Sequence, residues 1–490
     1  MKQKQVIVVG SGIAGLASAI RLACKGYTVR VFEKNSYPGG KLTAFQQEGF
    51  RFDAGPSLFT LPHQVDELFE LAGENPRAHF NYQRLPVACH YFWDDGTFLP
   101  AHGNEKEFAA EVEKTLNVPA KRVMDYLQKS RFIYETTAPV FLHRSLHIAR
   151  NFINLETLKG ILNMPRLGIF SRLHTDNVRQ LGDPKLVQLF DRYATYNGSD
   201  PYQAPAVLQS IPHLEFGQGA WFPEGGMHSI TTSLVALAKR KGVEFIFEKA
   251  VDEICVEQKQ ITGIRCGDNF FEADLVVCNS DIVPAYRKLL AIEKAPEKTL
   301  SQPRSSSALI FYWGINQQFA NLNMHNIFFS NDYEEEFRLI FEGKRISSDP
   351  TVYINITSNY LPSDAPENCQ NWFVMINVPG NTGQDWEQLI TQARKDILAK
   401  LSRRLGCDIA AQIQCESILD PRSIEQKTSS FQGSLYGSSS NNRYAAFLRQ
   451  ANRSSTIRNL YFCGGSVHPG GGIPLCLQSA RIVADLIPHA

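Results

Sequence analysis

Val6-Ile7-Val8-Val9-Gly10-Ser11-Gly12-Ile13-Ala14-Gly15 is the stretch that decides the fold of this 490-residue chain. The apolar run predicts a buried parallel strand, and the Gly-x-Gly-x-x-Gly pattern predicts a tight turn into a helix. Gly10 permits the turn, Gly12 lets the backbone approach a pyrophosphate, and Gly15 lets the helix pack closely on the strand. The helix is expected to begin near Ile13 and to end at Lys25-Gly26, a typical stop signal. Its N-terminus would direct free N–H groups at phosphates.

A second strand is expected over residues 27–32, and it ends in the acidic residue Glu33. An acid at this place accepts hydrogen bonds from ribose hydroxyls and favours an unphosphorylated ribose. The alternative is a glycine-rich turn in an ordinary βαβ unit. Because strand, glycines, helix stop and acid occur in the right order, we interpret the segment as a dinucleotide site.

Composition and charge exclude several classes of protein. A net charge of +1 argues against nucleic acid as a partner, and 43% apolar residues allow a large core. The ten cysteines form no C-x-x-C pair, so no metal site is predicted and a reduced, cytoplasmic setting is expected. The first residues resemble the start of a signal peptide, but the glycine spacing and Glu33 explain them better. No apolar run of about 18 residues predicts a membrane-spanning helix.

The residues after Glu33 indicate which dinucleotide binds. Phe32-Glu33-Lys34, followed by Gly39-Gly40-Lys41, resembles the second half of the FAD fingerprint of the amine oxidase and phytoene desaturase superfamily. This resemblance implies FAD rather than NAD. In that superfamily the segment matching Gly55-Pro56-Ser57 passes the flavin ring, although a plain β-turn after an edge strand would also explain it. The backbone at the position of Val251 commonly meets the adenine.

A second glycine-rich signal lies near the C-terminal end, over Leu460–Leu475. It predicts a buried strand, a turn containing Gly464, Gly465 and Gly472, and a helix with Pro474 in its first turn. The positive end of that helix can face the flavin pyrimidine ring, where negative charge gathers on reduction. The alternative is a plain glycine loop before a terminal helix.

Together these segments resemble the bacterial carotenoid desaturases of the phytoene desaturase type, and they span nearly the whole chain. The run from Phe52 to Pro62 is most similar to the 1-hydroxycarotenoid 3,4-desaturases. The resemblance implies an α/β fold: a Rossmann-like FAD-binding domain over residues 1–85, 222–290 and 421–490. An inserted α+β substrate domain with a membrane-facing helical part is expected over residues 86–221 and 291–420. The FAD-binding residues expected from the motifs and the resemblance are Gly10, Gly12, Ile13, Ala14, Gly15, Glu33, Lys34, Gly40, Lys41, Gly55, Pro56, Ser57, Val251, Gly464, Gly465, Gly472, Ile473 and Pro474.

The segment 141–182 is both apolar and basic. Only Glu156 and Asp176 oppose its arginines and lysine. A helical stretch of this kind can lie in the interface of a membrane with anionic lipids. The alternative is a pair of core-facing helices with a solvated basic rim. We expect a cytoplasmic protein that is peripherally associated with the inner face of the membrane.

The resemblance implies desaturation of a hydrophobic carotenoid at C3–C4 of a 1-hydroxylated acyclic end. A hydride passes to the flavin and a proton is lost, and oxygen or a membrane quinone reoxidises the flavin. The alternatives are another carotene desaturase, for instance one acting on phytoene, a carotenoid isomerase or saturase, an amine oxidase, and a prenyl-lipid carrier without chemistry. The sequence identifies no catalytic base, and Glu215 and His143 are weak candidates. The residues that could recognise the hydroxyl group of the substrate are His143, Arg144, Tyr193, Tyr196 and Asn197.

Overall fold

The fold is built on a parallel sheet, as the opening strand and glycines predict. A computed structural model describes residues 4–153, 155–290, 295–442 and 444–490. All neighbours in the five-stranded sheet run parallel, and β1 lies at its centre because both of its faces are apolar. The strands, in spatial order, are β19 (Leu460–Phe462), β13 (Leu275–Cys278), β1 (Gln5–Val9), β2 (Thr28–Phe32) and β9 (Glu244–Ile246).

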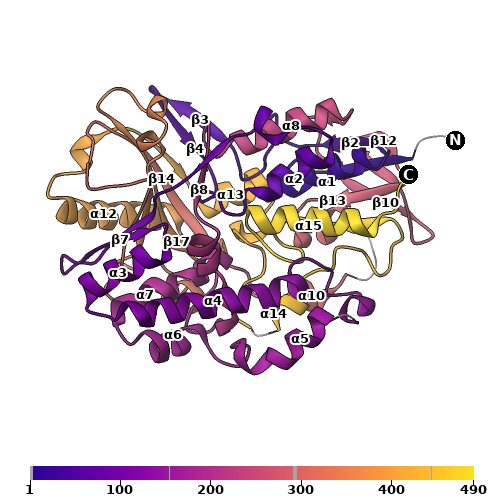
Figure 1. Cartoon of the computed structure of the whole chain (residues 1–490). Helices are drawn as coiled ribbons and strands as arrows, with labels where there is room; N and C mark the ends of the chain where they lie inside the picture. The colour runs from indigo at the N-terminus through magenta and orange to yellow at the C-terminus, as the bar shows by residue number, and fades with distance from the viewer. Residues whose placement is uncertain (1–3, 154, 291–294, 443) are drawn as a thin grey trace.

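Helices cover one face of this sheet and a small antiparallel sheet covers the other (Figure 1). The core on the helical side joins residues of α1 and of the C-terminal helix α15, which pack against each other. The covering helices are α1 (Ile13–Cys24), α2 (His63–Leu71), α8 (Ser229–Arg240) and α15 (Ile473–Leu486). The small sheet consists of β10 (Glu253–Glu257), β11 (Gln260–Cys266) and β12 (Asn269–Glu272).

A second, seven-stranded sheet forms the other half of the molecule. Its neighbouring strands are antiparallel except for β15 and β6, which run parallel. In spatial order the strands are β18 (Ile413–Leu419), β14 (Ser307–Ile315), β17 (Gln370–Val378), β16 (Val352–Asn355), β15 (His325–Phe328), β6 (Val87–Phe92) and β7 (Phe98–His102). Helix α12 (Trp386–Leu405) covers one face; Asp385 caps its start and Gly406, at φ +72°, ends it.

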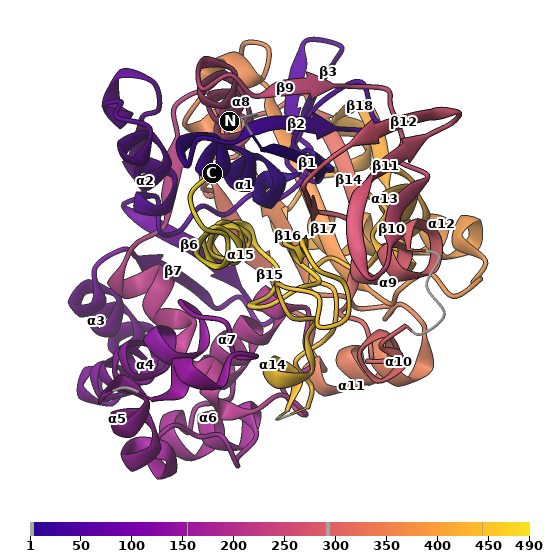
Figure 2. The ribbon, with the colours of Figure 1, turned by 90° about the vertical axis from the view of Figure 1, so that its right-hand side faces the viewer.

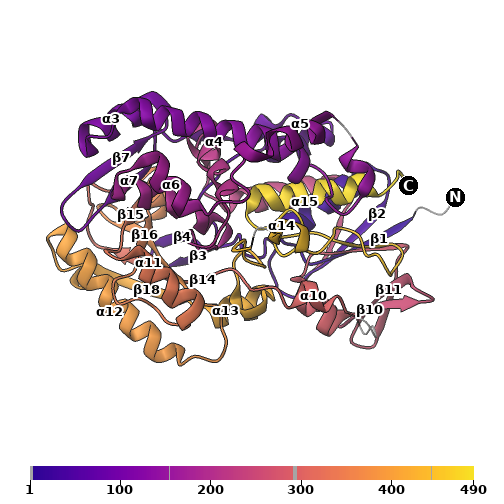
Figure 3. The same cartoon turned by 90° about the horizontal axis from the view of Figure 1, so that it is seen from below.

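A group of helices packs below the large sheet and beside the C-terminal helix (Figures 1 and 3). Helix α4 runs from Ala120 to Phe141 and contains Pro139 near its end. The helices of this group are α3 (Glu105–Leu116), α4 (Ala120–Phe141), α5 (Leu155–Asn163), α6 (Leu173–Leu181) and α7 (Pro184–Asp191).

Short elements complete the chain. In Figure 2 the helices α3 to α7 and the strands β10 to β12 lie on opposite sides of α15. The remaining strands are β3 (Ala44–Gln47), β4 (Phe50–Asp53), β5 (Tyr82–Arg84) and β8 (Trp221–Pro223). The remaining short helices are α9 (Ile282–Pro284), α10 (Glu297–Leu300), α11 (Tyr333–Arg338), α13 (Pro421–Thr428) and α14 (Ala445–Leu448). The predicted α/β class is therefore confirmed, whereas the division into an FAD domain and a substrate domain remains a prediction.

Candidate FAD and substrate site

A cavity of about 1400 Å³ runs from the parallel sheet to the large sheet. Its volume exceeds the ~300–1,000 Å³ of a typical small-molecule pocket. Most of the residues predicted to bind the cofactor line it, although they come from distant parts of the chain. These are Gly10, Gly12, Ile13, Ala14, Glu33, Lys34, Gly40, Lys41, Gly55, Pro56, Ser57, Val251, Gly464, Gly465, Gly472, Ile473 and Pro474. Gly15 does not line the cavity.

The glycine turn after β1 has the geometry that close approach of a ligand requires. Gly10 has φ +94°, a conformation that a side chain would strain. Gly12 is the N-cap of α1 and has no side chain, so it makes no capping hydrogen bond to the first turn of the helix. A Cβ atom at Gly15 would lie 2.2 Å from the carbonyl oxygen of Gly10. Gly15 therefore serves packing of the helix on the turn, as its position predicts.

Glu33 lies at the end of β2, where its carboxylate faces the glycine turn. The side chain is buried, and Oε2 accepts hydrogen bonds from Ser11 N at 2.8 Å and Ser11 Oγ at 2.7 Å. Oε1 accepts a hydrogen bond from Asn35 Nδ2 at 3.0 Å. These bonds hold a carboxylate beside the N-terminus of α1, at the carboxyl end of the parallel strands.

Lys41 lies further along the same wall. Its Nζ donates to the carbonyl oxygens of Ser434 at 3.0 Å and Leu435 at 2.8 Å. Burial lowers the pKa of Lys41 to about 8, and the nearby Asp281 works in the opposite direction. An anion bound in the cavity would therefore favour the charged form of this side chain.

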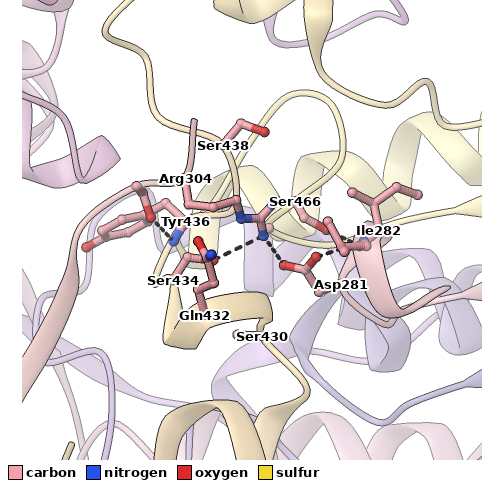
Figure 4. Close-up of polar contacts among 12 residues, drawn as sticks. Asp281, Ile282, Arg304, Ser430, Gln432, Ser434, Tyr436, Ser438 and Ser466 are labelled. Carbon is pink, nitrogen blue, oxygen red and sulfur yellow. Dashed lines mark hydrogen bonds and ion pairs between the residues drawn. The ribbon is translucent and has the colours of Figure 1, made fainter. Parts of the chain in front are cut away.

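The loop that Lys41 holds is also fixed by a buried ion pair (Figure 4). Arg304 pairs with Asp281 and donates to Ser434 Oγ at 3.0 Å, and both charged side chains are almost fully buried. Asp281 also caps α9 by accepting from Val283 N at 3.0 Å. The pair joins the end of β13 to the C-terminal loop and so fixes the cavity wall between them.

The C-terminal glycines meet the N-terminal ones across Asn279, which directly follows β13. Its Oδ1 accepts from Gly15 N at 3.1 Å, and its Nδ2 donates to the carbonyl oxygen of Cys463 at 3.2 Å. Asn279 lines the cavity and was not predicted as a site residue. Its position after a buried parallel strand was the available signal, since ligands bind at that edge of such sheets.

The far wall of the cavity is formed by the large sheet and the helical group. Residues of β6, β15 and β16 line it together with Arg192, Tyr196 and Glu215. Of the two catalytic candidates, Glu215 therefore reaches the cavity. His143 is not among the lining residues; its electrostatic neighbours are Arg481, His63 and Glu67, and burial is the main cause of its lowered pKa.

The geometry fits a dinucleotide such as FAD. The cradle at Gly10 and Gly12 has no room for side chains, an acid lies at the ribose position, and a lysine can face an anion. The cavity continues beyond this cradle to the strands of the large sheet. Within the described residues, no group of histidine, cysteine and acidic side chains is arranged to hold a metal ion.

Comparison with known proteins agrees with this geometry. The family described as flavin containing amine oxidoreductase matches residues 13–488. The 1-hydroxycarotenoid 3,4-desaturase of Flavobacterium sp. (strain P99-3) is 53% identical over 486 residues, which cover 99% of each chain. The 4,4'-diapolycopene oxygenase of Methylomonas sp is 31% identical over 493 residues, 99% of this chain and 98% of that protein.

Solved structures show the same fold at low identity. An oxidoreductase from Methanosarcina mazei superposes with a TM-score of 0.66 at 16% identity, covering 99% of this chain and 100% of that one. Cyclohexylamine oxidase from Brevibacterium oxydans gives a TM-score of 0.62 at 14% identity, covering 99% and 98%. The family match over residues 13–488 confirms the predicted flavin cofactor. The chain belongs to the flavin-containing amine oxidoreductase family, as a member of its carotenoid desaturase group.

Proposed function

We propose that this protein introduces a C3–C4 double bond at the 1-hydroxylated end of an acyclic carotenoid. The observation that carries the proposal is the similarity, along the whole chain, to the 1-hydroxycarotenoid 3,4-desaturase. The cavity supports it, because a glycine-rich wall continues into a largely apolar one. An elongated hydrocarbon needs such a wall, since it binds chiefly through the removal of apolar surface from water.

The residues of this chain would hold the cofactor in the following way. Glu33 accepts hydrogen bonds from the ribose, Lys34 and Val251 border the adenosine, and the turn from Gly10 to Ala14 receives the pyrophosphate. Gly55-Pro56-Ser57 and the N-terminus of α15 line the same cavity and would hold the flavin ring, with the positive end of the α15 dipole available to its negative charge. Lys41 adds a positive charge to the same wall.

FAD, when bound, supplies the two-electron acceptor for a hydride from C3 or C4. The neighbouring carbon loses a proton, and the new double bond extends the polyene. Apolar side chains on the far wall exclude water from this step. The two electrons would finally pass to oxygen or a membrane quinone.

A single turnover without oxygen distinguishes this function from its alternatives. The purified protein should carry flavin, which a lipid carrier would lack. Mixed anaerobically with a 1-hydroxylated acyclic carotenoid, it should form about one desaturated product per bound FAD, measured by chromatography and mass spectrometry. A primary amine should leave the flavin absorbance unchanged. Flavin bleaching by the amine would indicate an amine oxidase, and conversion of the pigment without a change of mass would indicate an isomerase.

We also propose that the substrate reaches the enzyme from a membrane surface, through an exposed apolar patch on and around α5. In the segment 141–182, large side chains that a globular core would bury face the solvent; Ile153 is 85% exposed. Arg144 forms an ion pair with Glu156 at 3.2 Å, whereas Lys159 and Arg166 are exposed beside the patch. The side chain of Arg150 lies outside the described residues. The patch consists of Ile153, Leu155, Leu158, Ile161, Leu162 and Phe170.

The helices of the described part of the chain include none that is long and apolar enough to cross a bilayer. The proposed association is therefore peripheral, with the apolar patch in the interface and the basic side chains at anionic headgroups. The proposal competes with the solvated-rim interpretation of the same segment.

Liposome flotation separates the two interpretations. Replacing Leu155, Leu158 and Leu162 by serine should lower binding to all vesicles about tenfold or more, because burial of each leucine contributes up to ~1.5–3 kcal/mol. The Lys159→Glu, Arg166→Glu pair should weaken binding only to anionic vesicles, at about 1 kcal/mol per charge. Phe270→Ser removes an exposed aromatic on β12 and is the control. Equal flotation of all variants would favour the solvated rim.

A further inference from the structure

A charged cluster lies in the otherwise mainly apolar far wall of the cavity. Glu215 Oε1 accepts a hydrogen bond from Tyr193 Oη at 3.0 Å, and Oε2 accepts one from Tyr196 Oη at 2.5 Å. Arg192 lies 3.6 Å from Glu215 Oε1 and donates to Tyr91 Oη at 2.6 Å. Its guanidinium also stacks over the ring of Tyr193, 4.5 Å from the centroid. Glu215 and Arg192 are both nearly fully buried.

Such a cluster is costly in a wall that faces only hydrocarbon. Burial removes the hydration of the carboxylate and of the guanidinium, which costs free energy. The attraction within the ion pair offsets this cost only if its geometry is good and further hydrogen bonds are present. The tyrosines supply those bonds here. Burial, and then the neighbouring Glu215, raises the pKa of Tyr193 and Tyr196 well above the ordinary value, so both phenols remain protonated and donate. The cavity wall therefore keeps a carboxylate that can accept one more hydrogen bond.

Only part of the cluster reaches the cavity. Arg192, Tyr196 and Glu215 line it, whereas Tyr193 supports Glu215 from behind. Tyr196 is half-buried and presents a hydroxyl that donates to Glu215 and can itself accept. Both groups therefore offer acceptor oxygens, to which a ligand alcohol can donate.

The cluster also lies on the route to the proposed flavin wall. Ser57 Oγ is 2.7 Å from Tyr353 Oη, which is 2.7 Å from His325 Nδ1. Burial, with the charge of Arg192 as a further cause, lowers the pKa of His325 to about 3, so this ring is neutral. Hydrogen bonds thus connect Ser57 to His325 through Tyr353, and Arg192 lies close enough to His325 for its charge to act on that ring. In the proposed substrate, the hydroxyl-bearing carbon C1 is separated from C3 only by C2.

We propose that Glu215 and Tyr196 bind the tertiary hydroxyl at C1 of the carotenoid and thereby set C3 and C4 against the flavin. This inference rests on the proposed function and names the residues that give it specificity. Arg192 and Tyr193 hold Glu215 in place and are positioning residues. The hydroxyl donates to the acceptor oxygens that Glu215 and Tyr196 present to the cavity, since the proton of Tyr196 is already donated to Glu215, so the end of the substrate is recognised by its polarity.

The test compares two substrates that differ only in the C1 hydroxyl. Glu215→Gln and Tyr196→Phe should each lower kcat/KM for the hydroxylated carotenoid about 10–100-fold, the effect of one hydrogen bond to a charged group. The same variants should leave kcat/KM for the carotenoid without the hydroxyl within about threefold of wild type, since that substrate makes no such bond. The loss should appear mainly in KM if the bond is kept throughout the reaction.

Matched controls are Glu336→Gln and Tyr126→Phe. Both side chains are buried and hydrogen-bonded, and neither lines the cavity. Flavin content and the unfolding temperature show whether each variant folds. If Glu215→Gln does not fold, the comparison is made with Tyr196→Phe, which removes only one oxygen atom. An equal loss on both substrates would overturn the hydroxyl-binding role. A wild-type enzyme without any preference between the substrates would instead contradict the proposed function itself.

Discussion

The Gly15→Ala variant is expected to lose FAD and to unfold at a lower temperature than the wild type. Its added Cβ atom would lie 2.2 Å from the Gly10 carbonyl oxygen and 2.9 Å from Asn279 Oδ1. Because the first contact is with backbone, helix α1 has to move away from the glycine turn. Overpacking of this kind costs about 1–3 kcal/mol or more. The displacement also moves the N–H groups that would hold the pyrophosphate, so FAD affinity should fall at least about tenfold, which corresponds to 1.4 kcal/mol.

The ratio of flavin absorbance to protein absorbance after desalting measures this loss, and a thermal unfolding curve measures the stability. Gly343→Ala is the control, because a Cβ atom there would meet Leu339 at an ordinary 3.4 Å. The control should keep its flavin. Full flavin content and an unchanged unfolding temperature in Gly15→Ala would contradict the close packing on which the FAD site depends.

Removal of the C1 hydroxyl from the substrate is expected to lower kcat/KM of the wild-type enzyme about 100-fold or more. An apolar tunnel binds a long hydrocarbon but rejects an added or missing hydroxyl only weakly. A site built to hydrogen-bond the hydroxyl discriminates strongly, because its buried polar groups are left unpaired when the hydroxyl is absent. Because the charged side chains of Glu215 and Arg192 line the cavity, we expect this strong discrimination between the two substrates.

Initial rates with a matched pair of acyclic carotenoids, presented in the same vesicles, measure this discrimination. Equal vesicle loading is checked by extraction of both pigments, because delivery from the membrane affects the apparent KM. Rates within a factor of about three for the two substrates would contradict the proposed function, because the enzyme would then not select the hydroxylated end.

The cofactor half of the molecule was predictable because its signals are local. Gly10 and Gly12 require a special backbone, and Glu33 follows at the end of the next strand, so a short range of sequence contains the whole pattern. Helix α12 (Trp386–Leu405) has local signals of the same kind, because Asp385 caps its start and Gly406 ends it.

The far wall of the cavity could not be assembled in this way. Strand β6 pairs in parallel with β15, with His90 opposite Asn326. No local sequence pattern predicts a pairing between segments that are so far apart in the sequence. Arg192 looked like an ordinary residue of a helical region, although it links Tyr91 of β6 to Glu215. The same limit applies to His143, whose position beyond the end of α4 removes it from the cavity lining.

The most direct test of the central claim is the identity of the product. The flavoprotein is incubated with a 1-hydroxylated acyclic carotenoid and, separately, with phytoene, and the extracted pigments are separated by chromatography and weighed by mass spectrometry. Our account predicts that the hydroxylated carotenoid loses one hydride and one proton at C3–C4, absorbs at longer wavelength, and reacts far faster than phytoene. A faster reaction on phytoene, or a new double bond elsewhere in the chain, would contradict it.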